Sequence, residues 1–304
     1  MDIKTCNVVR NSGFFMEGYH VWCGSVLKED DTYYMFASRW KKETGFPAGY
    51  MTNSEIVLAC TKDLKKPFKF ERVIIGKRAG GFWDSTMAHN PFIVRAENGY
   101  YLYYIGSPDG TMEKRAIGYA FAKSLDGEWH RSEKPFELPP DANNPAVIQR
   151  NTGEILLYFR DRALKVSVAV SDSYEGAFKV LQYDIFPSAR IEDMFVFKNG
   201  GEYIMVCEDA AGVYTGEKKS GVLFKSKDGV AWDENSAQKA YGFEIVYEDG
   251  KTARLQRRER PMILFDGRRN YLFTAAKEGG ETVLEGGNTG NIVQEILLNC
   301  AEAE

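Results

Sequence analysis

The stretch His89-Asn90-Pro91-Phe92-Ile93-Val94, followed by Tyr101-Leu102-Tyr103-Tyr104, is one copy of the repeated module that decides the fold of this chain. In each copy a short polar pair opens an apolar strand, and a Gly, Asn or Asp turn leads to a second strand rich in aromatic residues. The five copies begin at Trp22-Cys23, His89-Asn90, Asn143-Asn144, Glu192-Asp193 and Glu259-Arg260. A period of roughly 50–65 residues with about four strands per unit is typical of propeller blades. We therefore expect an all-β, five-bladed β-propeller.

The segments between these starts favour strands throughout. β-Branched and aromatic runs alternate with turns such as Asn98-Gly99, and no stretch has the sustained 3.6-residue periodicity of a long helix. The third strands are predicted at 54–60, 116–122, 165–171 and 221–225, and residues 291–298 would complete the fifth blade. Because a blade buries its faces only against its neighbours, we expect residues 1–304 to form one closed domain rather than two.

Charge and cysteine usage exclude several classes of partner. The 304 residues carry a formal net charge of −4, so we expect neither a nucleic acid nor an anionic membrane as a partner. The first residues are charged and no apolar run approaches the ~20 residues of a membrane span, so we expect no signal peptide and no transmembrane helix. The cysteines lack the paired spacing of a zinc site, which predicts a cytoplasmic protein without disulfides or structural zinc. They are Cys6, Cys23, Cys60, Cys207 and Cys300.

The five blade starts also predict a site. The first strand of a propeller blade lies nearest the axis, so the leading residues of all five should gather around one funnel mouth. The first column of residues reads Trp22, His89, Asn143, Glu192 and Glu259, and the second reads Cys23, Asn90, Asn144, Asp193 and Arg260. Three carboxylates, a histidine, an arginine and three asparagines would then converge on the axis. Two carboxyl groups held across a cleft are what cleavage of a glycosidic bond requires.

Further charged and aromatic residues lie close to the same strand ends. The arginines are Arg39, Arg160, Arg162, Arg257, Arg258 and Arg260. Each alone could form a rim ion pair, but together they suggest a substrate with a carboxylate, sulfate or phosphate group. Trp22, Trp40 and Trp83 could stack on sugar rings or belong to the core. Asp84 could supply a carboxylate from a loop or cap a turn.

These blade starts resemble those of the five-bladed propellers of the arabinanase and levansucrase superfamily, most closely glycoside hydrolase families 43 and 117. The resemblance rests on Trp22-Cys23-Gly24-Ser25, His89-Asn90-Pro91, Asn144-Pro145, Glu192-Asp193 and Glu259-Arg260-Pro261. It implies an aspartate base at the first start, an aspartate that tunes pKa at the third, and a glutamate acid at the fourth. Glu192 keeps the acid, whereas Cys23 and Asn144 replace the two aspartates. A replacement base would be Glu259 first, Asp193 second and Asp84 third.

We therefore predict a cytoplasmic glycosidase that acts on a short oligosaccharide and uses no metal or other cofactor. Glu192 would be the general acid, Glu259 the base or electrostatic partner, and Asp193 would orient its neighbour. The predicted substrate-binding residues are Trp22, Cys23, Arg39, Asp84, His89, Asn90, Asn144, Arg160 and Arg260. Two alternatives remain open. One is a glycoside phosphorylase resembling family 130, and the other is a catalytically silent propeller that binds a sugar or a partner.

Overall fold

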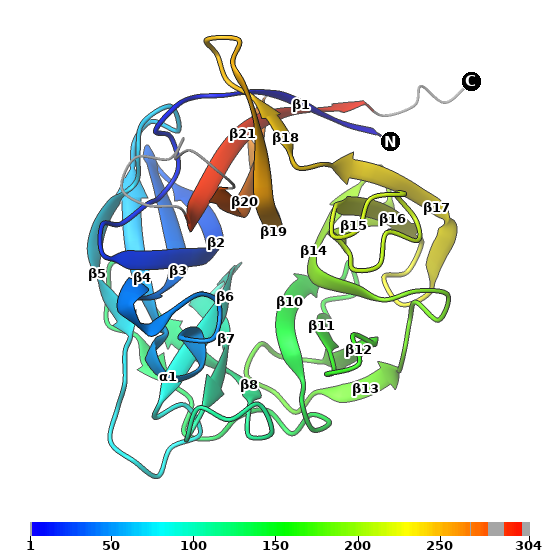
Figure 1. Ribbon diagram of the computed structural model, residues 1–304. Helices are drawn as coiled ribbons and strands as arrows, with labels where there is room; N and C mark the ends of the chain where they lie inside the picture. Colours follow the sequence, from blue (N-terminus) through cyan, green and yellow to red (C-terminus); the bar gives the residue numbers. More distant parts are fainter. Residues whose placement is uncertain (1, 268, 279–288, 300–304) are drawn as a thin grey trace.

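Five antiparallel sheets surround a central axis, as the repeat predicted (Figure 1). A computed structural model describes residues 2–267, 269–278 and 289–299. The innermost strands are β2 (Tyr19–Glu29), β6 (Met87–Ala96), β10 (Asn143–Gln149), β14 (Ile191–Asn199) and β19 (Thr252–Asp266). Each contacts the innermost strands of the two neighbouring blades, so the five blade starts meet at one end of the axis.

Each blade then continues outward through antiparallel neighbours in chain order. The second strands are β3 (Thr32–Lys41), β7 (Gly99–Ser107), β11 (Ile155–Arg160), β15 (Glu202–Asp209) and β20 (Arg269–Glu278). The third strands are β4 (Glu55–Thr61), β8 (Ala116–Ala122), β12 (Val166–Ser171), β16 (Gly221–Ser226) and β21 (Thr289–Asn299). The first four overlap the predicted third strands, and β21 covers residues 291–298, which were predicted to complete the fifth blade. The outer strands of the first four blades are β5 (Lys69–Ile75), β9 (His130–Arg131), β13 (Lys179–Gln182) and β17 (Trp232–Tyr241).

The fifth blade is closed by both ends of the chain. β1 (Asp2–Val8) pairs with β21 as the outer strand, and Asp2 lies opposite Asn299 in the register. β18 (Glu244–Val246) pairs with the beginning of β19. The described helical turns are short, η1 (Lys42–Thr44) and α1 (Tyr50–Asn53). Within the described ranges no helix is long and apolar enough to cross a membrane.

Both faces of a blade are buried against its neighbours, and β7 illustrates why. This strand is buried along its whole length, and its alternate residues face opposite sides. Tyr104 belongs to the same apolar cluster as Phe36 of the first blade. Tyr103 faces the third blade, where its ring lies 6.5 Å from that of Phe178. Near-continuous apolar and aromatic strands are therefore what this packing requires.

The backbone makes the same bulge at the start of every innermost strand. Between the first and fourth residues of each start, for example Glu192 and Phe195, the inner strand carries one residue more than its partner. The second-column residue is left-handed in all five blades, at Cys23 (φ 56°), Asn90 (53°), Asn144 (51°), Asp193 (61°) and Arg260 (55°). A bulge of this kind re-aims a side chain. Here it brings the second-column side chains together at the axis.

Cys6, Cys23, Cys60 and Cys207 are free thiols. Cys300 lies outside the described residues.

Candidate active site

A cavity of about 280 Å³ opens at the end of the axis where the blades begin, and residues of all five blades line it. Ten of the twelve predicted site residues lie on its wall. They are Trp22, Cys23, His89, Asn90, Asn144, Arg160, Glu192, Asp193, Glu259 and Arg260. Asn143 of the first column lines it too, and the 42–53 loop adds Phe46, Pro47 and Tyr50. The columns of blade starts therefore do converge on one pocket.

Arg39 and Asp84 do not line this cavity. Arg39 pairs in register with Val21, one residue beyond Ser38, the partner of Trp22, so its side chain leaves the opposite face of the strand. Its guanidinium binds Glu55 at 2.8 Å. Asp84 is fully buried within the second blade, where it accepts hydrogen bonds from Arg78 (2.6 Å) and from the hydroxyl of Tyr104 (2.7 Å). Both carboxylate–arginine pairs are structural contacts away from the axis.

The second column forms a chain of hydrogen bonds around the floor of the pocket. Cys23 Sγ donates to Asn90 Oδ1 (2.8 Å), and Asn90 Nδ2 donates to Asn144 Oδ1 (2.6 Å). Asn144 Nδ2 donates to Asp193 Oδ1 (2.5 Å). Arg260 donates to Asp193 from Nη1 (3.1 Å) and from its backbone nitrogen (3.2 Å). Asp193 is thus the terminal acceptor of the chain and the counter-ion of a buried arginine.

Glu192 and Glu259 stand beside this floor on neighbouring blades, and each is paired with an arginine. Arg160 Nη2 lies 3.0 Å from Glu192 Oε2, and Arg257 Nε lies 2.5 Å from Glu259 Oε1. Lys219 Nζ lies between the glutamates, 3.7 Å from Glu192 Oε1 and 3.8 Å from Glu259 Oε1. These two oxygens are therefore within about 7.5 Å of each other. Glycosidase carboxyl groups are about 5–9.5 Å apart.

The two glutamates differ in their electrostatic surroundings. Burial raises the pKa of Glu259, and the negative charge of Asp193 raises it further, although Arg257 and Lys219 oppose this shift. Glu192 has a more open position, and its two oxygens face the cations of Arg160 and Lys219. A carboxyl group with a raised pKa is suited to donate a proton near neutral pH.

A fourth carboxyl group, Glu208, completes the cluster and was not predicted. It lies directly opposite Glu192 in the register of β14 and β15, and its side chain is fully buried. Lys219 Nζ lies 3.0 Å from its Oε1, while its Oε2 has no hydrogen-bond partner in the described part of the chain. Burial, together with the charges of Glu259 and Asp193, raises the pKa of Glu208 well above its usual range.

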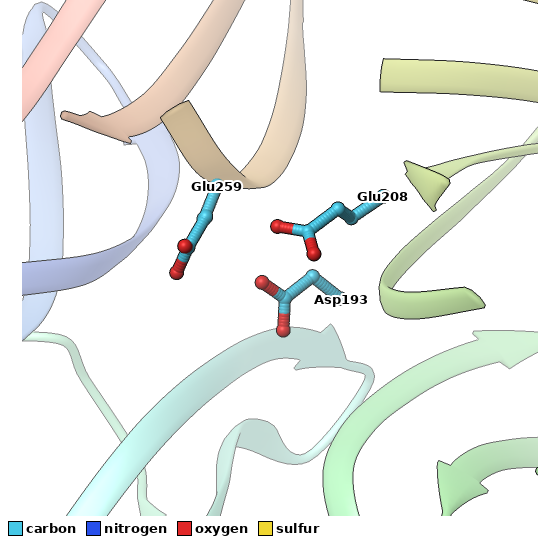
Figure 2. Close-up of side chains that lie close together, drawn as sticks. All are labelled: Asp193, Glu208 and Glu259. Carbon is cyan, nitrogen blue, oxygen red and sulfur yellow. The ribbon is translucent and has the colours of Figure 1, made fainter. Parts of the chain in front are cut away.

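Figure 2 shows the carboxyl groups of Asp193, Glu208 and Glu259 close together between the fourth and fifth blades. One oxygen of each lies within 4.8 Å of the others, which makes them a possible set of metal ligands. Each already has a side-chain cation at 2.5–3.1 Å, namely Arg260, Lys219 and Arg257 respectively. These cations balance the carboxylate charges, so we assign no metal to the cluster.

Asp209 holds the loop that carries Lys219. Its buried carboxylate accepts hydrogen bonds from the backbone N–H groups of residues 212 to 215 and from the hydroxyl of Thr215. Its backbone carbonyl accepts from the N–H of Lys219 at 2.7 Å. Lys219 itself is left-handed (φ 68°), which turns the chain back toward β16. The position of the ammonium group therefore depends on one buried aspartate.

Apart from Arg115, which precedes β8, neutral groups form the wall at the first and second blades. The ring of His89 stacks on Tyr50 with centroids 4.5 Å apart, and its Nδ1 lies 2.8 Å from Ser54 Oγ. Burial, helped by Arg260 and Arg115, lowers the pKa of His89 well below its usual range. Burial also raises the pKa of the Cys23 thiol. Cys23 lies 3.8 Å from His89 Nε2, but neither group carries the charge that would make the thiol a nucleophile.

Comparison with known proteins gave matches among solved structures alone. No family model matches the chain, and no curated protein matches it. A glycoside hydrolase superposes with a TM-score of 0.72 at 14% identity, covering 99% of this chain and 95% of the other. Zg3597, a family 117 glycoside hydrolase of the marine bacterium Zobellia galactanivorans, gives 0.69 at 15% identity, with 97% and 89% covered.

A third match is CoXyl43, a family 43 β-xylosidase/α-arabinofuranosidase from a compost microbial metagenome, solved with xylotriose in a calcium-free form. Its TM-score is 0.70 at 13% identity, and the alignment covers 98% of this chain and 96% of that one. The chain therefore has the five-bladed propeller fold of family 43 and family 117 glycoside hydrolases.

Proposed function

We propose that the protein is a glycosidase that hydrolyses a short oligosaccharide in the axial cavity. The observation that carries this proposal is the pair of carboxyl groups, Glu192 and Glu259, held on one cavity wall around Lys219. The cavity is also lined by the rings of Trp22, Phe46 and Tyr50, on which a sugar can stack. The volume of the cavity suits one or two sugar units at a time.

We assign the general acid to Glu259 and the base or stabilising carboxylate to Glu192, which reverses the roles that the family resemblance suggested. The raised pKa of Glu259 supports this assignment, because a general acid must hold its proton near neutral pH. Glu192 faces Arg160 and Lys219, as suits a group that acts as an anion. Asp193, bound to Arg260 in the floor, supports Glu259 through its charge.

The remaining wall residues would hold the substrate. His89, Asn90 and Asn144 offer neutral hydrogen-bonding groups for sugar hydroxyls, and the arginines favour a sugar with an anionic substituent. A cytoplasmic site of action remains part of this proposal.

Substitution of the two glutamates tests the assignment. We expect Glu259→Gln and Glu192→Gln to lower kcat about 10²- to 10⁴-fold on a panel of aryl glycosides. Glu202→Gln, at a glutamate that pairs with Lys227 outside the pocket, is the matched control and should keep full activity. Full turnover by both site variants would refute the proposal.

Leaving-group dependence separates the two roles. The Glu259→Gln variant should recover most of its rate on a 2,4-dinitrophenyl glycoside, because that leaving group departs without protonation. The Glu192→Gln variant should remain slow on every leaving group. If the two variants behave in the opposite way, Glu192 is the acid.

A glycoside phosphorylase is the second candidate, and the number of arginines in the pocket favours it. Such an enzyme needs one acid and a cationic site for phosphate in place of a second carboxylate. Turnover that requires added phosphate would decide for it. Binding of sugars with no turnover on any substrate would instead favour a silent binding propeller.

A further inference from the structure

The cavity is lined by one more arginine than carboxylate. Three of its four guanidinium groups pair with its three carboxylates, one to one. These pairs are Arg160 with Glu192 (3.0 Å), Arg257 with Glu259 (2.5 Å) and Arg260 with Asp193 (3.1 Å). The fourth, Arg115, forms no ion pair with any residue that the structure describes.

Arg115 is nevertheless buried, with an exposed fraction of 6%. It immediately precedes β8 and contacts neutral oxygens: Nη1 donates to Tyr50 Oη (3.2 Å) and Nε to the Met112 carbonyl (3.4 Å). Its Nη2 has no hydrogen-bond partner within the described ranges. A buried cation without a counter-ion is costly, so its presence in a polar pocket calls for a partner.

Two carboxylates interact with Arg115 through their charge, and both already bind another arginine. They are Glu113 and Asp141, which bind Arg162 at 3.0 and 3.3 Å. Arg160 lines the same cavity, and burial, together with the positive charge of Arg160, lowers the pKa of Arg115. Arg160 also has a buried Nε without a partner among the described residues. This side of the cavity therefore carries an uncompensated positive charge.

We propose that Arg115 is the receptor for an oxyanion that binds in the cavity, and that this oxyanion is the acidic substituent of the substrate sugar. The guanidinium presents Nη2 and the second N–H of Nη1, a geometry that binds a carboxylate, sulfate or phosphate through two hydrogen bonds. The identification of the sugar rests on the proposed function, whereas the oxyanion site does not require catalysis. Free phosphate, the co-substrate of a phosphorylase, has the same chemistry and is the alternative source.

Calorimetric titration separates these possibilities. The ligands are glucuronic acid, glucose and inorganic phosphate, each titrated at low ionic strength into the wild type and into Arg115→Gln and Arg115→Lys. The matched control is Arg95→Gln, an exposed arginine at the far end of β6 in the same blade, paired with Glu29.

We expect the wild type to bind glucuronic acid more tightly than glucose. Arg115→Gln should lose about 10- to 100-fold in affinity for glucuronic acid and little for glucose, because charge-assisted hydrogen bonds are lost. The affinity of Arg115→Lys for glucuronic acid should fall between those of the wild type and Arg115→Gln. The affinity of Arg95→Gln should match that of the wild type. Tight binding of phosphate that Arg115→Gln abolishes would support the oxyanion site and assign it to free phosphate.

A stability measurement guards against misfolding. Because Arg115 has no counter-ion, Arg115→Gln should unfold at a Tm equal to or above that of the wild type. Two results would overturn the inference. In the first, the wild type binds glucose and glucuronic acid equally well and does not bind phosphate. In the second, Arg115→Gln keeps the anion affinity of the wild type. Anion binding without hydrolysis of any glycoside would leave the inference standing and remove the proposed function.

Discussion

Replacement of Asp193 by Asn tests whether the floor of the pocket is held by one buried ion pair. Asn also adopts the left-handed conformation readily, so the φ of 61° at this position adds no strain of its own. The amide can still accept through Oδ1, but its NH₂ would face the backbone N–H of Arg260, which now donates to Asp193 Oδ2. Arg260 would remain buried without its counter-ion.

Breaking one partner of such a buried pair costs about 3–5 kcal/mol. We expect urea denaturation at pH 7 to give this loss in the free energy of unfolding of Asp193→Asn. Asp141→Asn is the matched control, because Asp141 is also left-handed (φ 65°) and pairs with an arginine, Arg162, that is half exposed. An exposed pair contributes about 0–1 kcal/mol, so the control should change little.

The double variant Asp193→Asn/Arg260→Asn removes both charges and should be more stable than Asp193→Asn alone. The single substitution Asp193→Asn also removes the negative charge that raises the pKa of Glu259. The limb of the pH–rate profile that reports Glu259 should therefore move to lower pH. A loss below about 1 kcal/mol for Asp193→Asn, equal to that of the surface control, would refute the reasoning.

Three further predictions concern Glu208, His89 and Asp209. The pKa of Glu208 is raised in the folded protein. The stability that this carboxyl group contributes is therefore complete at pH values below its ordinary pKa of 4.5, and is lost as the pH rises through its pKa in the folded state. The unfolding free energy of Glu208→Gln should therefore fall less than that of the wild type between about pH 5 and pH 8 in urea titrations, and equal slopes would contradict this. The ring of His89 should stay neutral from about pH 6 to pH 8, so its NMR signals should not titrate there, whereas a midpoint near the ordinary 6.5 would show that the ring is not desolvated. Asp209→Asn should speed hydrogen exchange of the amides of residues 212 to 215, and unchanged protection would show that the loop does not depend on the carboxylate.

The fold can be predicted from the sequence because every blade must bury its strands in the same way. A strand that is buried on both faces must be apolar along its length, as β7 is, and this leaves a clear signal at each repeat. The blade starts can be aligned from the sequence alone, and this alignment predicts that Glu192 and Glu259 lie in one pocket. The aligned blade starts did not predict the bulge, because its left-handed residues are not all of one type and include Asn, Cys and Arg.

The residues that sequence reasoning misplaced or missed have separate physical causes. On β3, Ser38 pairs with Trp22 and so shares its face of the sheet. Side chains alternate between the two faces of a strand, so the next residue, Arg39, points away from the pocket and could have been excluded. The same reasoning on β15 would have found Glu208 opposite Glu192. Lys219 and Arg115 come from connections between strands, where individual turns decide the direction of a side chain and no repeat exists to align.

The pairing of β1 with β21 joins residues almost 300 positions apart, since Asp2 lies opposite Asn299. During synthesis the ring must therefore stay open until its last strand has left the ribosome, which takes roughly 15 to 60 s at common translation rates. Throughout that interval the first blade lacks its neighbour on one side, and β1 has no partner strand. Until β21 is made, the new chain thus carries an unpaired edge and an uncovered apolar face, two features that favour aggregation.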